Sequence, residues 1–453
     1  MSLVLALLGL GISVALVIRN ARGDRVSQLV FLFSAVHVLY VFPKVLALSV
    51  SSAPSAEYFR MNGVTSTVAY MALSSYLATI IAYELLAPKS GVAYGIENMK
   101  AFMKRMSRFA ITIGGLGLLA FLGLMARNGG LNNYFLGLAY YQMDLSGMTV
   151  WLIFLSRFTY PAIAAMALVA ALRPSRFSLT VLTLLCVFPL MNVIFLFRRS
   201  DLLFLGFIAI HALTLSGRIR ANRAFVLASI GVMSLLIVLF PYFRQESISA
   251  VTGWDYNIAE MTVQERVTDS LEVDADDEIV RAASTIDYAY QTGNFQYGAF
   301  VWDSLVNQFV PATLVGAEAK NALFLGRGMD SNTVQSYFDQ QSFFYVAPMG
   351  FAQAYEQFGP FGWIIFAALG ALIAGVERKS WKVSNRIFLM VAIPIVSLAA
   401  SNDISSVPAR LVTFWVLSRF LGSARFLVYS PRVRQSYGLA KIFTHREMRE
   451  LRG

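Results

Sequence analysis

Residues 194–206 read IFLFRRSDLLFLG, two apolar runs that meet at Arg198, Arg199 and Asp201 with almost no loop between them. A backbone inside lipid must satisfy its own hydrogen bonds, so apolar runs of this kind form helices. Long charged side chains at such a corner reach toward the boundary between hydrocarbon and water. The stretch therefore predicts a tight turn between two membrane-spanning helices, and its role depends on the side of the membrane that it faces.

The composition of the whole chain agrees with a membrane protein. Of its 453 residues, 57% are hydrophobic and only 14% are charged, whereas a soluble globular protein has about 25% charged residues. The single cysteine, Cys186, excludes an intramolecular disulfide. The three histidines, His37, His211 and His445, lack the spacing of metal ligands, so we expect neither a metal site nor a cofactor.

Eleven apolar runs are long enough to cross the hydrocarbon core, which takes about 17 to 25 residues. They are approximately residues 2–18, 27–49, 64–87, 107–126, 148–172, 177–197, 200–216, 224–243, 348–376, 387–402 and 407–427. The run 348–376 is long enough to tilt or to begin as a re-entrant segment. Residues 2–18 are followed by the basic RNARGDR rather than by a cleavage site, so we interpret them as the first span and not as a signal peptide.

The net charge of +11 follows an alternating pattern along the chain. In this assignment, 24 of the 37 Lys and Arg residues lie in alternate loops and in the tail. The positive-inside rule explains that pattern better than nucleic-acid binding does. We therefore expect the N-terminus outside, the tail in the cytoplasm and no nucleic-acid partner.

This topology divides the chain into four parts and predicts an all-α polytopic fold. Residues 1–243 contain helices 1–8, residues 244–347 form a large outer loop, residues 348–427 contain helices 9–11, and residues 428–453 form a basic cytoplasmic tail. The loop holds fifteen acidic residues against five basic ones. Within it, Ile279, Ala283, Ile286 and Tyr290 recur at helical spacing, which predicts an amphipathic helix. We expect the loop to form a mostly helical cap.

Several arginines are predicted to converge from the outer leaflet. Arg244 ends the eighth span, Arg410 opens the eleventh, and Arg157 is roughly 15 Å deep in the fifth at about 1.5 Å per residue. Arg419 is predicted at a comparable depth in the eleventh. Charge at mid-membrane is expensive and indicates a functional site. Together with Arg198 and Arg199, these guanidinium groups suit the diphosphate head of a lipid, although Arg198 and Arg199 could instead simply pair with Asp201 at the interface.

Four sequence motifs resemble those of Wzy-type polymerases of oligosaccharide repeat units. FRRSDLLFLGFIAI (197–210) is similar to the arginine-bearing start of a mid-chain span, and LFPYFRQES (239–247) to the end of the next span before a large periplasmic loop. VPATLVGAEAKNALF (310–324) resembles a proline-containing segment late in that loop, although it lacks a basic residue beside the proline. MGFAQAYEQFGPFGWIIFAALG (349–370) resembles the returning span.

The resemblance implies an enzyme that joins undecaprenyl-diphosphate-linked oligosaccharides into O-antigen or a related surface polysaccharide. It would work without metal or nucleotide sugar at the periplasmic face of a bacterial inner membrane, on a GT-C-like fold shared with O-antigen ligases. By position, Arg199, with Arg198, and Arg244 match the functional arginines of the family. We also expect a chain-length regulator and a flippase as partners, besides membrane lipid.

The remaining assignments follow from the chemistry that such a reaction needs. An acceptor hydroxyl requires a general base, for which Glu356 is the first candidate, followed by Asp403 and Asp201. Tyr345 and Tyr355 are candidates for stacking on sugars, although interfacial aromatics are common in membrane proteins. We expect His37 and His211 to make helix-packing hydrogen bonds, and Lys44 to extend toward the interface.

Two alternatives stay open at the level of the sequence. An O-antigen ligase would keep the chemistry and change the acceptor, but none of the three histidines lies in the outer loop, where such ligases use one. A flippase or transporter for the same lipid belongs to a different class. Such proteins often carry inverted repeats and broken helices, neither of which is evident here.

Overall fold

Apolar segments become long helices in the computed structural model, which describes residues 1–21, 28–88, 93–96, 99–130, 133–134, 147–196, 199–218, 224, 231, 277–310, 315–326, 349–380, 382–421 and 426–429. Four spans are single helices: α1 (Ser2–Asn20), α5 (Val64–Leu86), α6 (Met99–Arg127) and α10 (Arg176–Leu196). Two more are interrupted: α2 (Leu29–Val36) continues through the π-helix His37–Val41 into α3 (Phe42–Val50), and α8 (Gly147–Ser156) is followed by α9 (Thr159–Leu172).

By length and composition, six helices in the described part of the chain can cross a membrane, and a bent pair may be counted as a seventh. The pair consists of α19 (Gly350–Phe358) with its 3-10 turn Gly359–Phe361, and α20 (Trp363–Glu377), which meet at 110°. The chain is thus a helical, polytopic membrane protein. Of the two alternatives for the run 348–376, the bend fits a re-entrant start rather than a tilt, and it fits a broken span equally. A broken helix is thus present, although none is evident in the sequence.

The remaining four predicted spans do not appear as long membrane-crossing helices among the described residues. Predicted span 224–243 lies outside the described residues, apart from two isolated positions. The runs 200–216 and 387–402 correspond to the shorter apolar helices α11 (Arg199–Leu215) and α21 (Val383–Leu398). The prediction of a helix over 407–427 is wrong at its end, because α22 covers only Val407–Arg419 and Phe426–Tyr429 form strand β2.

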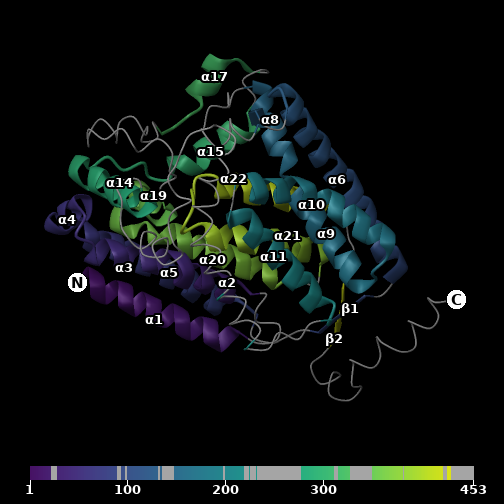
Figure 1. Ribbon diagram of the computed structural model, residues 1–453, viewed down its shortest axis with the longest axis horizontal. Helices are drawn as coiled ribbons and strands as arrows, with labels where there is room; N and C mark the ends of the chain where they lie inside the picture. Colours follow the sequence, from purple (N-terminus) through teal and green to yellow (C-terminus); the bar gives the residue numbers. More distant parts are fainter. Residues whose placement is uncertain are drawn as a thin grey trace, which may run out of the picture.

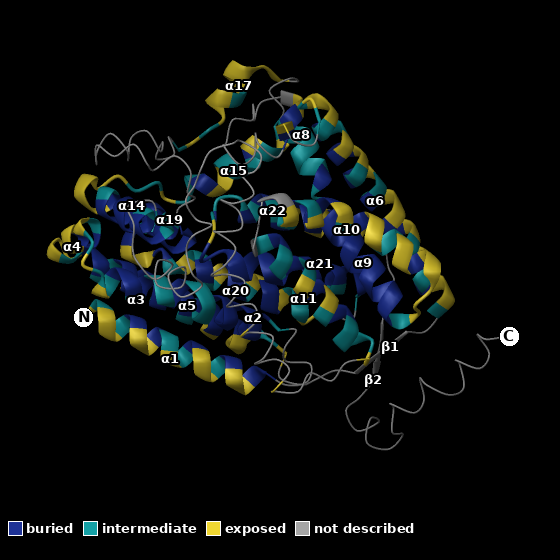
Figure 2. Ribbon diagram, viewed as in Figure 1, coloured by how far each residue is buried: buried dark blue, intermediate teal, exposed yellow. Residues whose placement is uncertain are grey.

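Helix α21 is the centre of the molecule. Its residues are buried along almost the whole length, as Figure 2 shows, and it contacts α2, α9, α11, α20 and α22. Because α21 is buried on all sides, it lies in the core of the bundle and not against lipid. The helices α1, α6 and α10 lie at the periphery and expose apolar side chains, which suits a surface facing lipid.

A close backbone contact joins α5 to α20. A Cβ atom added to Gly370 of α20 would lie 2.4 Å from the carbonyl oxygen of Thr79 in α5. The Thr79 hydroxyl also donates to the carbonyl oxygen of Phe366, at 3.3 Å. Small residues allow membrane helices to approach in this way, because packing and interhelical hydrogen bonds replace the hydrophobic effect inside lipid.

One end of the bundle, here called the basic end, collects the C-terminal ends of α1, α5 and α20. Arg19 pairs with Glu84 at 2.7 Å, and the Arg378 guanidinium donates to the carbonyl oxygen of Leu86. Strand β1 (Ala93–Ile96), which follows α5 in the chain, pairs antiparallel with β2, with Ala93 opposite Tyr429. The sequence did not predict this ribbon.

The opposite end, here called the cap end, holds the shorter helices, drawn along the upper and left parts of Figure 1. They are α4 (Pro54–Met61), α14 (Glu278–Thr292), α15 (Ala299–Phe309), α17 (Ala317–Ala322) and α19. Helix α14 is the amphipathic helix that the sequence predicts: Ile279, Ala283 and Ile286 are buried. Tyr290 is the exception, because its side chain is 66% exposed.

Candidate functional site

Three of the predicted site residues cannot be placed. Arg198, Arg244 and Tyr345 lie outside the described residues. Arg199 begins α11, but its side chain is likewise outside the described part. The other candidate site residues are Glu356, Asp403, Asp201, Tyr355, Arg157, Arg410 and Arg419, and the structure describes the side chains of all seven.

Helix α19 presents polar side chains from a buried position. A Cβ atom on Gly350 would lie 1.8 Å from the carbonyl oxygen of Ala399 and 2.8 Å from that of Asn402, so only glycine fits where α19 begins. Residues 350–357 are buried, apart from the half-buried Gln353. The segment is thus seated directly against the turn that follows α21.

Gln353 connects α19 to Asp403 in that turn. Its amide nitrogen donates to Oδ1 of Asp403 at 2.8 Å, and its amide oxygen accepts from the backbone N–H of Ile404 at 2.7 Å. The backbone N–H of Ser405 donates to the same Oδ1 at 2.9 Å. Oδ2 of the half-buried Asp403 receives no hydrogen bond from the described residues. The carboxylate is therefore oriented through one of its two oxygens.

Glu356 lies one turn further along α19 and is 8% exposed. The Gln296 side-chain amide donates to its Oε1, and the Gln296 backbone N–H donates to its carbonyl oxygen at 3.1 Å. The Gln357 side chain donates to the Gln296 amide oxygen at 3.1 Å. Glu356 is thus a buried carboxylate, held by the segment that follows α14.

Tyr355, a candidate for stacking on sugars, is only 2% exposed. Its ring lies 6.0 Å from that of Phe295, between centroids, at an interplanar angle of 69°. The side chain packs inside the cap end and offers no open face to a ligand.

Arg157 and Asp201 lie close to the interruption between α8 and α9. The backbone N–H of Tyr160 donates to the carbonyl oxygen of Arg157 at 3.1 Å, so these two residues are one helical turn apart. The Tyr160 hydroxyl donates to Oδ1 of Asp201 in α11 at 2.5 Å. Asp201 is 7% exposed, and its buried Oδ2 has no partner among the described residues. The half-buried Arg157 thus lies one helical turn from Tyr160, the residue that binds the buried Asp201 carboxylate.

Arg410 and Arg419 occupy opposite ends of α22. Arg410 is half-buried in the first turn of the helix, and α22 packs against α21, α9 and α15. Arg419 is exposed and its guanidinium stacks on the Trp415 ring, 4.6 Å from the centroid. The structure does not bring the two arginines together, because nine residues of helix separate them by about 13 Å.

Helix α15 packs beside the segments that carry Arg157, directly after α8, and Arg410, in the first turn of α22. It contacts both α8 and α22. The Phe309 ring is 5.9 Å from that of Phe154, and the Gln308 amide donates to the hydroxyl of Thr413 at 3.3 Å. The cap end therefore gathers two half-buried arginine-bearing segments under one helix of the predicted outer loop.

Ionic and polar contacts attach α14 to the membrane helices. Lys44 of α3 forms an ion pair with Asp277, which also accepts the N–H of Ile279 and so caps α14. Lys44 thus does not simply extend to the interface as predicted. The Tyr58 hydroxyl donates to the fully buried Asp287 at 3.2 Å. At the start of the helix, burial raises the pKa of the Glu278 carboxyl from 4.5 to about 8.

His37 lies among packed helices. His37 is fully buried, its Nδ1 lies 2.8 Å from the carbonyl oxygen of Phe33, and its ring packs beside Phe42 and Tyr76. This hydrogen bond lies within one helix and is not the helix-packing hydrogen bond that the sequence predicts, although the ring does pack against Tyr76 of α5. Among the described residues, no group of three or more His, Cys, Asp or Glu side chains is placed to hold a metal ion.

Sequence reasoning missed Gln296, Gln353 and Tyr160, which hold the candidate carboxylates. A signal existed for α19, since Gln353, Glu356 and Gln357 are spaced to share one helix face. Tyr160 and Gln296 carry no comparable signal, because their partners are 41 and 60 residues away.

Comparison with protein-family models, with curated proteins and with solved structures finds no match to this chain.

Proposed function

We propose that the chain is a metal-independent membrane glycosyltransferase that polymerises undecaprenyl-diphosphate-linked oligosaccharide repeat units. In this assignment the cap end faces the periplasm of a bacterial inner membrane, and the eleven-span, GT-C-like topology holds. The observation that carries the proposal is that α15 packs against α8, which ends one residue before Arg157, and against α22, whose first turn holds Arg410, so that both arginine-bearing segments lie beside the same cap helix.

The arginines would bind the leaving diphosphate. Guanidinium groups remain charged at all physiological pH values and can bind phosphate oxygens through two parallel hydrogen bonds. Their half-burial strengthens this attraction, because fewer water molecules screen the charges. Arg157 and Arg410 would stabilise the negative charge that develops as undecaprenyl diphosphate leaves the donor sugar. Arg198, Arg199 and Arg244 remain proposed members of the same site.

Asp403 is the preferred general base. An acceptor hydroxyl of a single lipid-linked repeat unit would attack the anomeric carbon of the donor chain. The new glycosidic C–O bond forms as the bond from that carbon to the diphosphate oxygen breaks, and the hydroxyl proton passes to Oδ2 of Asp403. Asp403 is favoured over Glu356 and Asp201, because it is half-buried while the other two are less than one-tenth exposed.

A matched pair on one helix tests the arginine assignment. Arg410→Ala, expressed in a strain lacking the native gene, should abolish the ladder of polymer lengths. Arg419→Ala should leave the ladder intact, since that side chain is exposed at the other end of α22. Membrane levels of both variants are measured by immunoblotting. A full ladder from normally expressed Arg410→Ala would exclude this site.

A second pair tests the base and separates the competing functions. Purified Asp403→Asn should lose at least about a hundredfold in the rate of converting lipid-linked units to polymer in detergent, while Asp403→Glu should retain part of it. Wild-type protein that makes no polymer in detergent but moves the lipid across vesicles would instead be a transporter. If gene deletion removes single capped repeat units as well as long chains, a ligase is indicated.

A further inference from the structure

The turn between α14 and α15 contains an unusual backbone conformation. Tyr297 has a φ of 49°, and it is the only residue other than glycine with positive φ in the described part of the chain. Its neighbours in the turn with positive φ are Gly293, at 63°, and Gly298, at 87°. For a bulky side chain this region of backbone space is strained, so that glycine is the residue expected at position 297.

Packing does not account for the tyrosine. The side chain is 74% exposed, and its one ring contact among the described residues is with Phe295, at 6.4 Å between centroids. An exposed ring gains little from burial. The protein therefore holds a strained aromatic residue at a place where its own stability would favour glycine. Strain of this kind persists where the surrounding structure imposes it, and it is concentrated at functional sites.

The surrounding structure fixes this turn against α19. The Tyr297 backbone N–H donates to the carbonyl oxygen of Gln357 at 2.8 Å, and the Gly298 N–H donates to the Gln357 side-chain oxygen at 3.1 Å. On the other side of Tyr297, Gln296 makes two hydrogen bonds to Glu356. The ring is thus displayed in water from a rigid support, directly beside the segment that carries Glu356.

We propose that Tyr297 is a binding platform on which a sugar ring of the lipid-linked oligosaccharide stacks, an inference that rests on the proposed function. One face of a pyranose ring is lined by C–H groups, which pack on an aromatic face. A tyrosine provides such a face with little loss of conformational freedom on binding. Among the described residues, Tyr297 rather than the buried Tyr355 is therefore the candidate tyrosine that meets the saccharide.

The test compares two ligands on the purified full-length protein. The first is the pool of undecaprenyl-diphosphate-linked saccharides extracted from a strain lacking this gene, and the second is undecaprenyl diphosphate without sugar. The variants are Tyr297→Gly, which removes both ring and strain, and Tyr297→Phe, which keeps the ring. Tyr290→Ala serves as the control, because Tyr290 is similarly exposed but lies in the regular helix α14.

Wild type, Tyr297→Phe and Tyr290→Ala should bind the saccharide-bearing lipid more tightly than the bare lipid. Tyr297→Gly should lose about tenfold in affinity for the saccharide-bearing lipid alone, while its Tm stays equal to or above that of wild type. If Tyr297→Gly has a lower Tm than wild type, or binds the saccharide-bearing lipid as tightly as wild type does, Tyr297 is not a sugar-binding platform. The polymerase proposal is unaffected by either result. A wild-type protein that binds both lipids equally and makes no polymer overturns both.

Discussion

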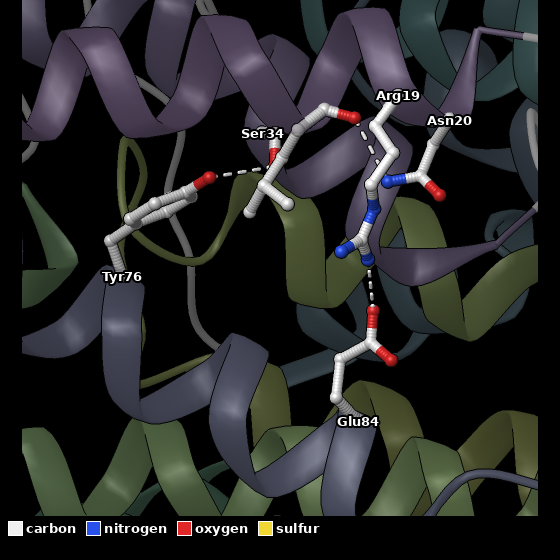
Figure 3. Close-up of polar contacts among 6 residues, drawn as sticks. Arg19, Asn20, Ser34, Tyr76 and Glu84 are labelled. Carbon is white, nitrogen blue, oxygen red and sulfur yellow. Dashed lines mark hydrogen bonds and ion pairs between the residues drawn. The ribbon is translucent and has the colours of Figure 1, made fainter.

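Two ion pairs, one at each end of the bundle, join helices that are distant in sequence. At the basic end, Arg19 of α1 reaches Glu84 of α5, as Figure 3 shows, and the two side chains are 54% and 49% exposed. At the cap end, Lys44 pairs with Asp277, and the exposed fractions are 22% and 9%. The same chemistry therefore operates in water at one end and largely out of water at the other.

The difference in exposure between the two ion pairs indicates which end of the bundle is held more rigidly. An exposed pair contributes little to stability, because water and salt screen it, whereas the removal of one partner from a buried pair leaves an uncompensated charge. The Asp277 carboxylate also caps α14, and Asp287 further along the helix is bound by Tyr58. The cap end is thus held by buried polar contacts, as a site that must position its reacting groups requires.

The largest effect is expected where α19 meets the turn after α21. Gly350→Ala should lower the free energy of unfolding by about 3 kcal/mol or more, because the added Cβ meets backbone atoms that cannot rotate away. Gly375→Ala in α20 is the control, since a Cβ there meets nothing within 4 Å, and it should be neutral or slightly stabilising. Thermal unfolding in detergent, followed by tryptophan fluorescence, measures both; equal Tm values for the two variants would contradict the tight seat of α19.

The two ion pairs themselves give the next effect. Lys44→Met should cost about 2 kcal/mol, because it leaves Asp277 mostly buried without its cation. Arg19→Met should cost about 0.5 kcal/mol or less. The same unfolding measurement, repeated at high salt, should narrow the gap between wild type and Arg19→Met only. If Lys44→Met and Arg19→Met lower the free energy of unfolding by similar amounts, burial does not make the ion pair at the cap end more important for stability than the one at the basic end.

The smallest effect concerns pH. Because burial raises the pKa of Glu278 from 4.5 to about 8, the folded state keeps a proton that the unfolded chain releases. The resulting stabilisation is complete below pH 4.5 and is lost as the pH rises to about 8. Glu278→Gln should flatten the Tm profile between pH 5 and 8 and stabilise the protein at pH 8 by on the order of 1–2 kcal/mol, since the helix end can relax as the carboxylate ionises. A variant profile parallel to that of wild type contradicts this ionisation.

The sequence predicts most of the helices but little of the site. Hydropathy locates the six long spans because lipid imposes one length and one composition on any helix that crosses it. The same signal runs through the end of α22, where the chain turns into strand β2, because apolar character alone does not separate a helix from a short strand. The site depends on contacts between distant segments, such as Gln296 with Glu356, which no local pattern encodes.

Two arginines that the sequence places alike have different surroundings in the structure. Their positions within apolar runs predict that Arg157 and Arg419 lie at comparable depth in the membrane. Arg157 is half-buried at a break between two helices, whereas Arg419 is exposed at a helix end. Hydropathy measures the distance along an apolar run but not the residue at which the helix stops, and that residue decides how far an arginine is packed among other side chains.

The contact between α5 and α20 sets a condition on how the protein is made. Thr79 and Gly370 meet backbone to backbone, yet about 280 residues must be synthesised between the end of one helix and the start of the other. At about 5–20 residues per second, that interval lasts tens of seconds. Throughout it, α5 lies in the bilayer without the helix that later packs against its Thr79 face. The Thr79 hydroxyl can wait there without a polar cost, because it also donates to the carbonyl oxygen of Ser75 in its own helix, at 2.9 Å.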